Sequence, residues 1–147
     1  MINRPFLQSQ KHKEQHQRAL REGAHPDIIE FERVFVARMA KQGIPLFAHN
    51  MVRTPSEQKA MYVMGHSKKD GSTPYAHAGC AVDIVHGVMA WNLERESWTM
   101  LGHIGMEIAL QMGVKLVWGG DWSFYDPAHW ELANWRELVG GFPFKGG

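Results

Sequence analysis

Residues 77–85 read HAGCAVDIV and join a polar segment to a short apolar run. The run 80–85 has the length and composition of a buried strand. His77 and Asp83 lie six residues apart, so they have the same parity on an extended chain and can point the same way. Histidine and carboxylate side chains are the ligands that a catalytic zinc takes from proteins. The stretch therefore predicts a strand that carries groups able to bind a metal, but spacing alone does not select the ligands among the nine histidines of the chain.

Before this stretch the sequence predicts two helices and a strand. Apolar residues recur at helical spacing over 26–43, between a proline and a glycine that suit the two ends of a helix. Residues 44–52 are apolar and short enough for a strand, which places Arg53 at its end. Thr54-Pro55-Ser56-Glu57 reads as a capping box with proline at the first helical position, so a helix follows to about Gly65.

After this stretch the chain alternates again between helical and extended patterns. A helix is predicted over 98–112, a strand over 114–118, a short strand over 129–131 and a last helical turn or two over 133–139. Residues 66–75 have the composition of an exposed loop. No regular βαβ repeat links these elements, so we expect an α+β fold in which helices flank a small antiparallel sheet.

The whole chain has the size and composition of one globular domain. It has 147 residues, of which 44% are hydrophobic and 21% are charged. The polar segment 1–24 is expected to form a solvated helix or an arm, and 25–147 to form the domain. A formal net charge of +1 gives no overall field that recruits nucleic acid or an anionic membrane. No apolar run reaches the roughly 20 residues of a membrane helix.

Four segments in this order resemble one known family. HAGCAVD at 77–83 resembles the metal motif of the zinc D-alanyl-D-alanine carboxypeptidases and phage L-alanyl-D-glutamate endopeptidases. RTPSEQ at 53–58 resembles their arginine-containing helix start, WGGDW at 118–122 their second glycine turn, and DPAHWE at 126–131 their C-terminal ligand motif. The resemblance implies the hedgehog/D-Ala-D-Ala peptidase-like fold over about 44–131.

The resemblance also implies the site residues. It implies Zn²⁺ held by His77, Asp83 and His129, with Asp126, three residues before the last histidine, as the acid and base. The chain departs from the family in having only one residue between His77 and Gly79, where the family usually has two. His86, which is also near Asp83 in the sequence, is therefore the substitute for His77 as the first ligand.

Further residues are expected to contact the reacting groups or the substrate. Arg53 can stabilise the oxyanion. Gln58 of the arginine motif and Tyr75, which replaces a serine of the family, are candidate substrate contacts. Trp122 and Trp130 are candidates for aromatic walls that grip a peptide or sugar.

Simpler interpretations stand beside these roles. Asp126 followed by proline is also a plain turn signature, and Arg53 can pair with Glu57. Glu131 shares strand parity with the last ligand and can orient it or replace Asp126 as the base. Cys80 is expected to be a small buried hydrophobe, although a nearby histidine leaves a cysteine hydrolase as a further hypothesis.

The predicted function is hydrolysis of amide bonds in peptidoglycan stem peptides by a zinc metallopeptidase that acts as a monomer. An L-alanyl-D-glutamate endopeptidase of the phage endolysin type is favoured, with a D,D-carboxypeptidase or a non-catalytic metal-binding module as alternatives. The single cysteine and the absence of a signal-like start suggest synthesis in the cytoplasm. Action on the cell wall would then follow release across the membrane.

Overall fold

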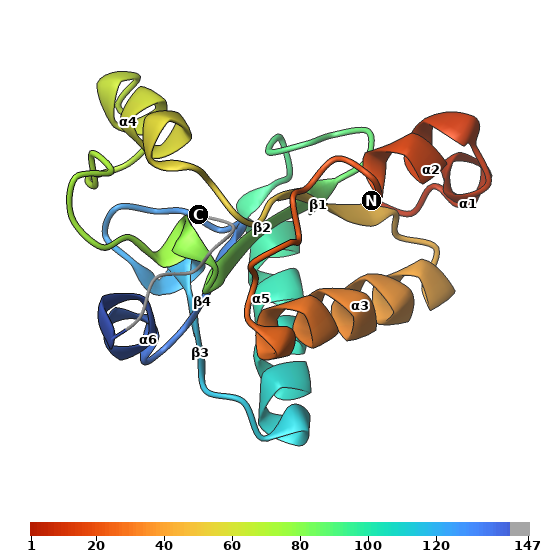
Figure 1. Cartoon of the computed structure of the whole chain (residues 1–147). Helices are drawn as coiled ribbons and strands as arrows, with labels where there is room; N and C mark the ends of the chain where they lie inside the picture. The colour runs from red at the N-terminus through yellow and green to blue at the C-terminus, as the bar shows by residue number, and fades with distance from the viewer. Residues whose placement is uncertain (142–147) are drawn as a thin grey trace.

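A computed structural model of the chain describes residues 1–141 as a four-stranded antiparallel sheet with helices around it (Figure 1). The strands lie in the order β1-β2-β4-β3. The last six residues of the predicted domain, 142–147, lie outside the described residues. The elements, in chain order, are α1 (Arg4–Leu7), α2 (Gln10–Gln15), α3 (Pro26–Lys41), β1 (Leu46–Asn50), α4 (Pro55–Val63), η1 (Ala76–Ala78), β2 (Ala81–His86), α5 (Arg95–Met112), β3 (Leu116–Trp118), η2 (Gly119–Asp121), β4 (His129–Leu132) and α6 (Trp135–Gly141).

The hydrophobic core lies between the sheet and the helices α3 and α5, which contact each other (Figure 1). Trp130 of β4 packs against Phe31 and Phe35 of α3, with ring centroids 5.0 and 5.6 Å away. Gly105 of α5 lies directly over the Trp130 ring, where a Cβ atom would overlap it. Because side chains alternate along a strand, His129 and Glu131 on either side of Trp130 face away from this core.

The turn into α4 has the capping box that the sequence predicts. The Thr54 side chain accepts a hydrogen bond from the Glu57 amide, and the Glu57 carboxylate accepts one from the Thr54 amide. Glu57 is therefore used at the helix start, and the alternative pairing of Arg53 with Glu57 is not found. The antiparallel pairing of β2 with β1 and β4 then brings Asp83 opposite Asn50 and His129.

The N-terminal segment 1–24 packs along the edge of the sheet. The Asn3 amide donates to the Gly43 carbonyl, and the Gln15 side chain donates to the Gly87 carbonyl. His86 donates from Nε2 to the Met1 carbonyl at 2.7 Å, at the far end of β2 from Asp83. His86 therefore does not substitute for His77 as a metal ligand. No helix within residues 1–141 has the length and apolar character of a membrane span.

Candidate metal centre and active site

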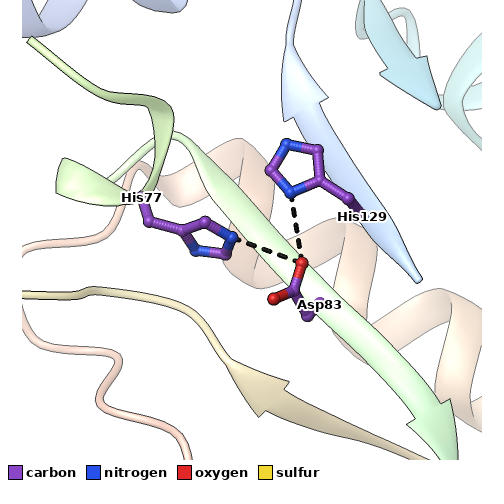
Figure 2. A group of neighbouring side chains, drawn as sticks. All are labelled: His77, Asp83 and His129. Atoms are coloured by element: carbon purple, nitrogen blue, oxygen red, sulfur yellow. Dashed lines mark hydrogen bonds and ion pairs between the residues drawn. The ribbon is translucent and has the colours of Figure 1, made fainter. Parts of the chain in front are cut away.

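Three buried side chains converge where η1, β2 and β4 meet. His77, Asp83 and His129 each offer one ligand atom, and these atoms all lie within 4.8 Å of one another. A single carboxylate oxygen, Asp83 Oδ1, lies 3.3 Å from His77 Nε2 and 3.1 Å from His129 Nδ1 (Figure 2). This is the only cluster of this kind among the residues that the structure describes.

The hydrogen bonds of His77 favour a cation at this point. Its Nδ1–H donates to the Met51 carbonyl at 2.7 Å, which leaves Nε2 facing Asp83. Burial lowers the pKa of His77 despite the nearby carboxylate, so Nε2 carries a lone pair at neutral pH. A lone pair and a carboxylate oxygen cannot bond each other directly. The donor set and its orientation therefore fit a metal ion between them.

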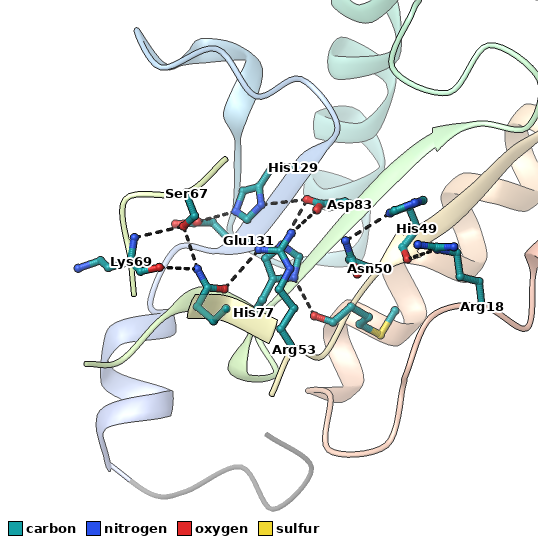
Figure 3. Close-up of polar contacts among 12 residues, drawn as sticks. Arg18, His49, Asn50, Arg53, Ser67, Lys69, His77, Asp83, His129 and Glu131 are labelled. Carbon is teal, nitrogen blue, oxygen red and sulfur yellow. Dashed lines mark hydrogen bonds and ion pairs between the residues drawn. The ribbon is translucent and has the colours of Figure 1, made fainter. Parts of the chain in front are cut away.

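Asp83 is held from its other side by Arg53. The guanidinium donates to Asp83 Oδ2 at 2.9 Å, and both side chains are buried (Figure 3). Burial alone would raise the pKa of Asp83, but His77 and His129 outweigh it and hold the pKa well below its usual value. The pairing leaves Oδ1 directed at the two imidazoles, while Arg53 Nε is buried without a partner among the described residues.

Glu131 fixes the ring of His129. Its carboxylate accepts a hydrogen bond from His129 Nε2 at 2.8 Å, so Nδ1 is the nitrogen that faces Asp83. Burial alone would lower the pKa of His129. Hydrogen bonds to Asp83 and Glu131, together with the charges of Asp83 and Asp126, raise that pKa to about 10. Orientation of a ligand histidine by a carboxylate is typical of metal sites.

Asp126 lies on the loop between η2 and β4 and lines the same cavity as both histidines. Burial, and then the charge of Asp83, raise its pKa to about 6. The loop is tied to Gly119, whose carbonyl accepts from the Asp126 amide at 3.0 Å. A Cβ atom on Gly119 would overlap the Asp126 carbonyl, so only glycine allows this close approach.

The cavity in front of these groups has a volume of about 400 Å³. Trp122 and Phe124 form part of its wall, and the Trp122 ring lies 5.2 Å from the His129 ring. Tyr75 also lines it, with a hydroxyl that donates to the Arg53 carbonyl at 2.7 Å. Gln58 lines it too, but its amide donates to Ser67 Oγ and to the Lys69 carbonyl.

The structure brings all but one of the expected site residues to the metal cluster or to the cavity beside it. Trp130 is 1% exposed within the core and does not line the cavity, so its expected contact with substrate is wrong. The prediction that His77 lies on an extended chain in parity with Asp83 is also wrong. His77 lies on the 3₁₀ turn η1 before Gly79, which has a φ of 133°. Cys80 is fully buried, and burial raises the pKa of its thiol to about 12, which removes the nucleophile of a cysteine hydrolase.

Several residues of the cavity lining were not singled out from the sequence, and Trp135 and Arg136 are among them. Trp135 and Arg136 begin α6, which packs against η1 and lines the cavity together with Gln58 of α4. Nothing in the local pattern separates Trp135 from an ordinary core tryptophan. Trp135 is recognised as a cavity residue only from its position in the folded structure, beside a cavity with charged walls.

Comparisons with known proteins agree with this geometry. No family model matches the chain. The chain is 28% identical over 127 residues to the peptidoglycan L-alanyl-D-glutamate endopeptidase CwlK of Bacillus subtilis strain 168, across 74% of this chain and 72% of that protein. It superposes on the L-Ala D-Glu endopeptidase ChiX of Serratia marcescens with a TM-score of 0.64 and 22% identity, over 88% of this chain and 90% of the other.

A second solved structure has a related fold. The vancomycin-resistance D,D-pentapeptidase VanY, solved as a mutant in complex with Zn(II), matches with a TM-score of 0.50 and 12% identity, over 80% of this chain and 76% of the other. The α+β fold with a small antiparallel sheet and the resemblance to these peptidases are therefore both confirmed.

Proposed function

We propose that the chain is a zinc-dependent peptidase that hydrolyses peptidoglycan stem peptides, as an L-alanyl-D-glutamate endopeptidase. The observation that carries this proposal is the buried cluster of His77, Asp83 and His129 beside a cavity that Asp126 also lines. The peptidase class is supported by CwlK and by the fold shared with ChiX. The choice of an endopeptidase over a D,D-carboxypeptidase follows CwlK.

The chemistry follows from where each group lies. A zinc ion held by the three side chains would polarise the scissile carbonyl and lower the pKa of a water molecule. Asp126 accepts the proton of the attacking water and passes it to the leaving amine as the C–N bond breaks. Its pKa of about 6 suits a group that must accept and then donate near neutral pH. Arg53, through its unpartnered Nε–H, is positioned to stabilise negative charge on the scissile oxygen.

Mass spectrometry of fragments released from purified peptidoglycan tests the proposal. We expect new amino termini at D-glutamate, lost when the metal is chelated and restored when zinc is added. Loss of terminal D-alanine alone would change the assignment to a D,D-carboxypeptidase. A zinc-loaded protein that cleaves none of several wall types would be a metal-binding module instead.

The setting of the reaction is part of the proposal. The chain would act on the cell wall as a monomer, after release from the cytoplasm in the manner of a phage endolysin. Sedimentation of the zinc-loaded protein at several concentrations tests the monomer. Lysis of bacteria from without, compared with lysis when a holin is co-expressed, tests the route to the wall.

A further inference from the structure

The cavity beside the metal cluster has acidic groups that are buried or half-buried and, besides the buried Arg53, basic groups that are exposed. Asp126 and Glu131 are the acidic groups, and Lys68, Lys69 and Arg136 are exposed basic residues of the lining. Within residues 1–141 none of these three cations takes part in an ion pair. Unpaired cations that line a concave site favour an anionic ligand.

Two of these cations are held in place by aromatic rings. The Arg136 guanidinium lies over the Trp135 ring, 4.4 Å from its centroid. The Lys68 ammonium lies 5.4 Å from the Phe124 centroid, so the loop after α4 meets the loop that carries Asp126. Such contacts restrict a long side chain and reduce the ordering that ligand binding must supply.

A neutral donor lies next to Arg136. Trp135 is 3% exposed, and its indole Nε1 is buried without a hydrogen-bond partner among the described residues. A buried N–H group that lacks an acceptor costs stability, so most such groups in native proteins have one. Because Trp135 lines the cavity, an acceptor on a bound substrate can fill this place.

We infer that Trp135 and Arg136 form a subsite for a carboxylate on the leaving side of the scissile bond, with Lys68 and Lys69 as further cations of the same lining. The inference rests on the proposed function, because a glutamate on the leaving side has two carboxyl groups. Only one of them is used to continue the peptide, and the other stays free. A carboxylate accepts hydrogen bonds from both a guanidinium and an indole N–H.

Paired synthetic peptides test this subsite. One contains an L-alanyl-D-glutamyl bond with the free carboxylate, and the other has the same carboxylate converted to an amide. We expect the zinc-loaded protein to prefer the acid over the amide in kcat/KM, and Arg136→Gln to reduce that preference about tenfold. Trp135→Phe keeps an aromatic ring but removes the N–H, so it should reduce the preference by a smaller factor.

Lys115→Gln is the matched control, because Lys115 is exposed and lies outside the cavity lining. Lys115→Gln removes one positive charge, as Arg136→Gln does, but it should keep the wild-type preference for the acid over the amide. An acid-to-amide ratio that stays at the wild-type value in both Arg136→Gln and Trp135→Phe would overturn the subsite while leaving the proposed peptidase intact. Cleavage of neither peptide by the zinc-loaded protein would overturn the proposed function and this inference with it.

Discussion

Asp83 uses its two carboxylate oxygens for different tasks. Oδ1 faces His77 and His129, whereas Oδ2 accepts a hydrogen bond from Arg53. Removing one partner of a buried ion pair leaves an uncompensated charge, which is far more costly than losing an exposed pair. Arg53 therefore positions Asp83, a proposed metal ligand, and also lines the cavity, so a single substitution there should change metal binding and turnover together.

Asp126 can be separated from metal binding by Asp126→Asn. Loss of the proton acceptor should reduce kcat by at least about 100-fold, while zinc content stays at the wild-type value because Asp126 is not among the three ligands. Peptide hydrolysis and zinc content by elemental analysis are the two measurements. Asp121→Asn, on the exposed turn η2 outside the cavity lining, is the control. An active Asp126→Asn would assign the base to another residue.

Glu131 is the alternative to Asp126 as the catalytic base, but its hydrogen bond to His129 favours a different role. Because it accepts the hydrogen bond from His129 Nε2, Glu131→Gln should weaken zinc affinity by about 10- to 100-fold. Competition with a chromophoric chelator measures this, and the exposed Glu137→Gln is the control. At saturating zinc the variant should still turn over. A complete loss of kcat under that condition would instead make Glu131 the base.

At the scale of elements, the sequence predicts the helices and strands well because their signals are local. The capping box at Thr54 begins α4, and the apolar run after Cys80 becomes β2. The position of His77 is different, since the shortened spacing to Gly79 is absorbed by the turn η1 rather than by a strand. Motif order led to His77 as the proposed ligand, whereas strand parity predicted the wrong backbone conformation for it.

The wrong and missed residues share one physical cause. Trp130 follows His129, and only the face that α3 covers decides which of the two points to the core. Trp135 lies in a helix that packs against η1, a contact between segments far apart in the sequence. Tertiary packing decides whether each tryptophan faces the core or the cavity, and sequence periodicity does not show it.

The glycine turn η2 links β3 to the acid/base residue, and Gly119→Ala tests that link. A Cβ atom would overlap the Asp126 carbonyl, so the loop must shift and kcat should fall at least about tenfold, since small misplacements of catalytic groups have effects of this order. Zinc content should persist. Gly113→Ala, at the end of α5 and outside the cavity lining, is the control, because an added Cβ there meets no atom within 4 Å and strains only the local backbone. Wild-type kcat in Gly119→Ala would mean that the loop adapts without cost.

At the scale of the whole molecule, the buried cluster of His77, Asp83 and His129 affects both folding stability and the proposed metal binding. Two histidines, Asp83 and Glu131 are buried beside the sheet face opposite α3 and α5, and Arg53 pairs with Asp83 there. A second cation near these two carboxylates would offset the remaining cost of burying them. In the metal-free protein a proton on His129 supplies that cation, since its pKa is raised to about 10. Zinc takes the place of that proton, so the two forms should depend differently on pH.

The sign of this dependence follows from the pKa of His129. The folded state holds its proton more tightly than the unfolded chain, so the stabilisation is complete below about pH 6.5 and is lost as the pH rises toward about 10. The pKa values of four other histidines are lowered, so their effect on folding stability falls below this pH window: His16, His49, His77 and His86. Asp126, with a pKa of about 6, also changes stability only below this window. The Cys80 thiol changes stability only near pH 9 and above.

The melting temperature of the chelator-treated protein should therefore fall between about pH 6.5 and 8.5, while that of the zinc-loaded protein should not. Calorimetry at fixed ionic strength measures both. The zinc-loaded form is the internal control, because His129 Nδ1 would carry no proton if it binds the metal as proposed. A metal-free protein whose melting temperature stays level across this window would mean that His129 is already neutral. The burial of the cluster would then need another source of compensation, and the hydrogen bonds to Asp83 and Glu131 could not both be made in the absence of the metal.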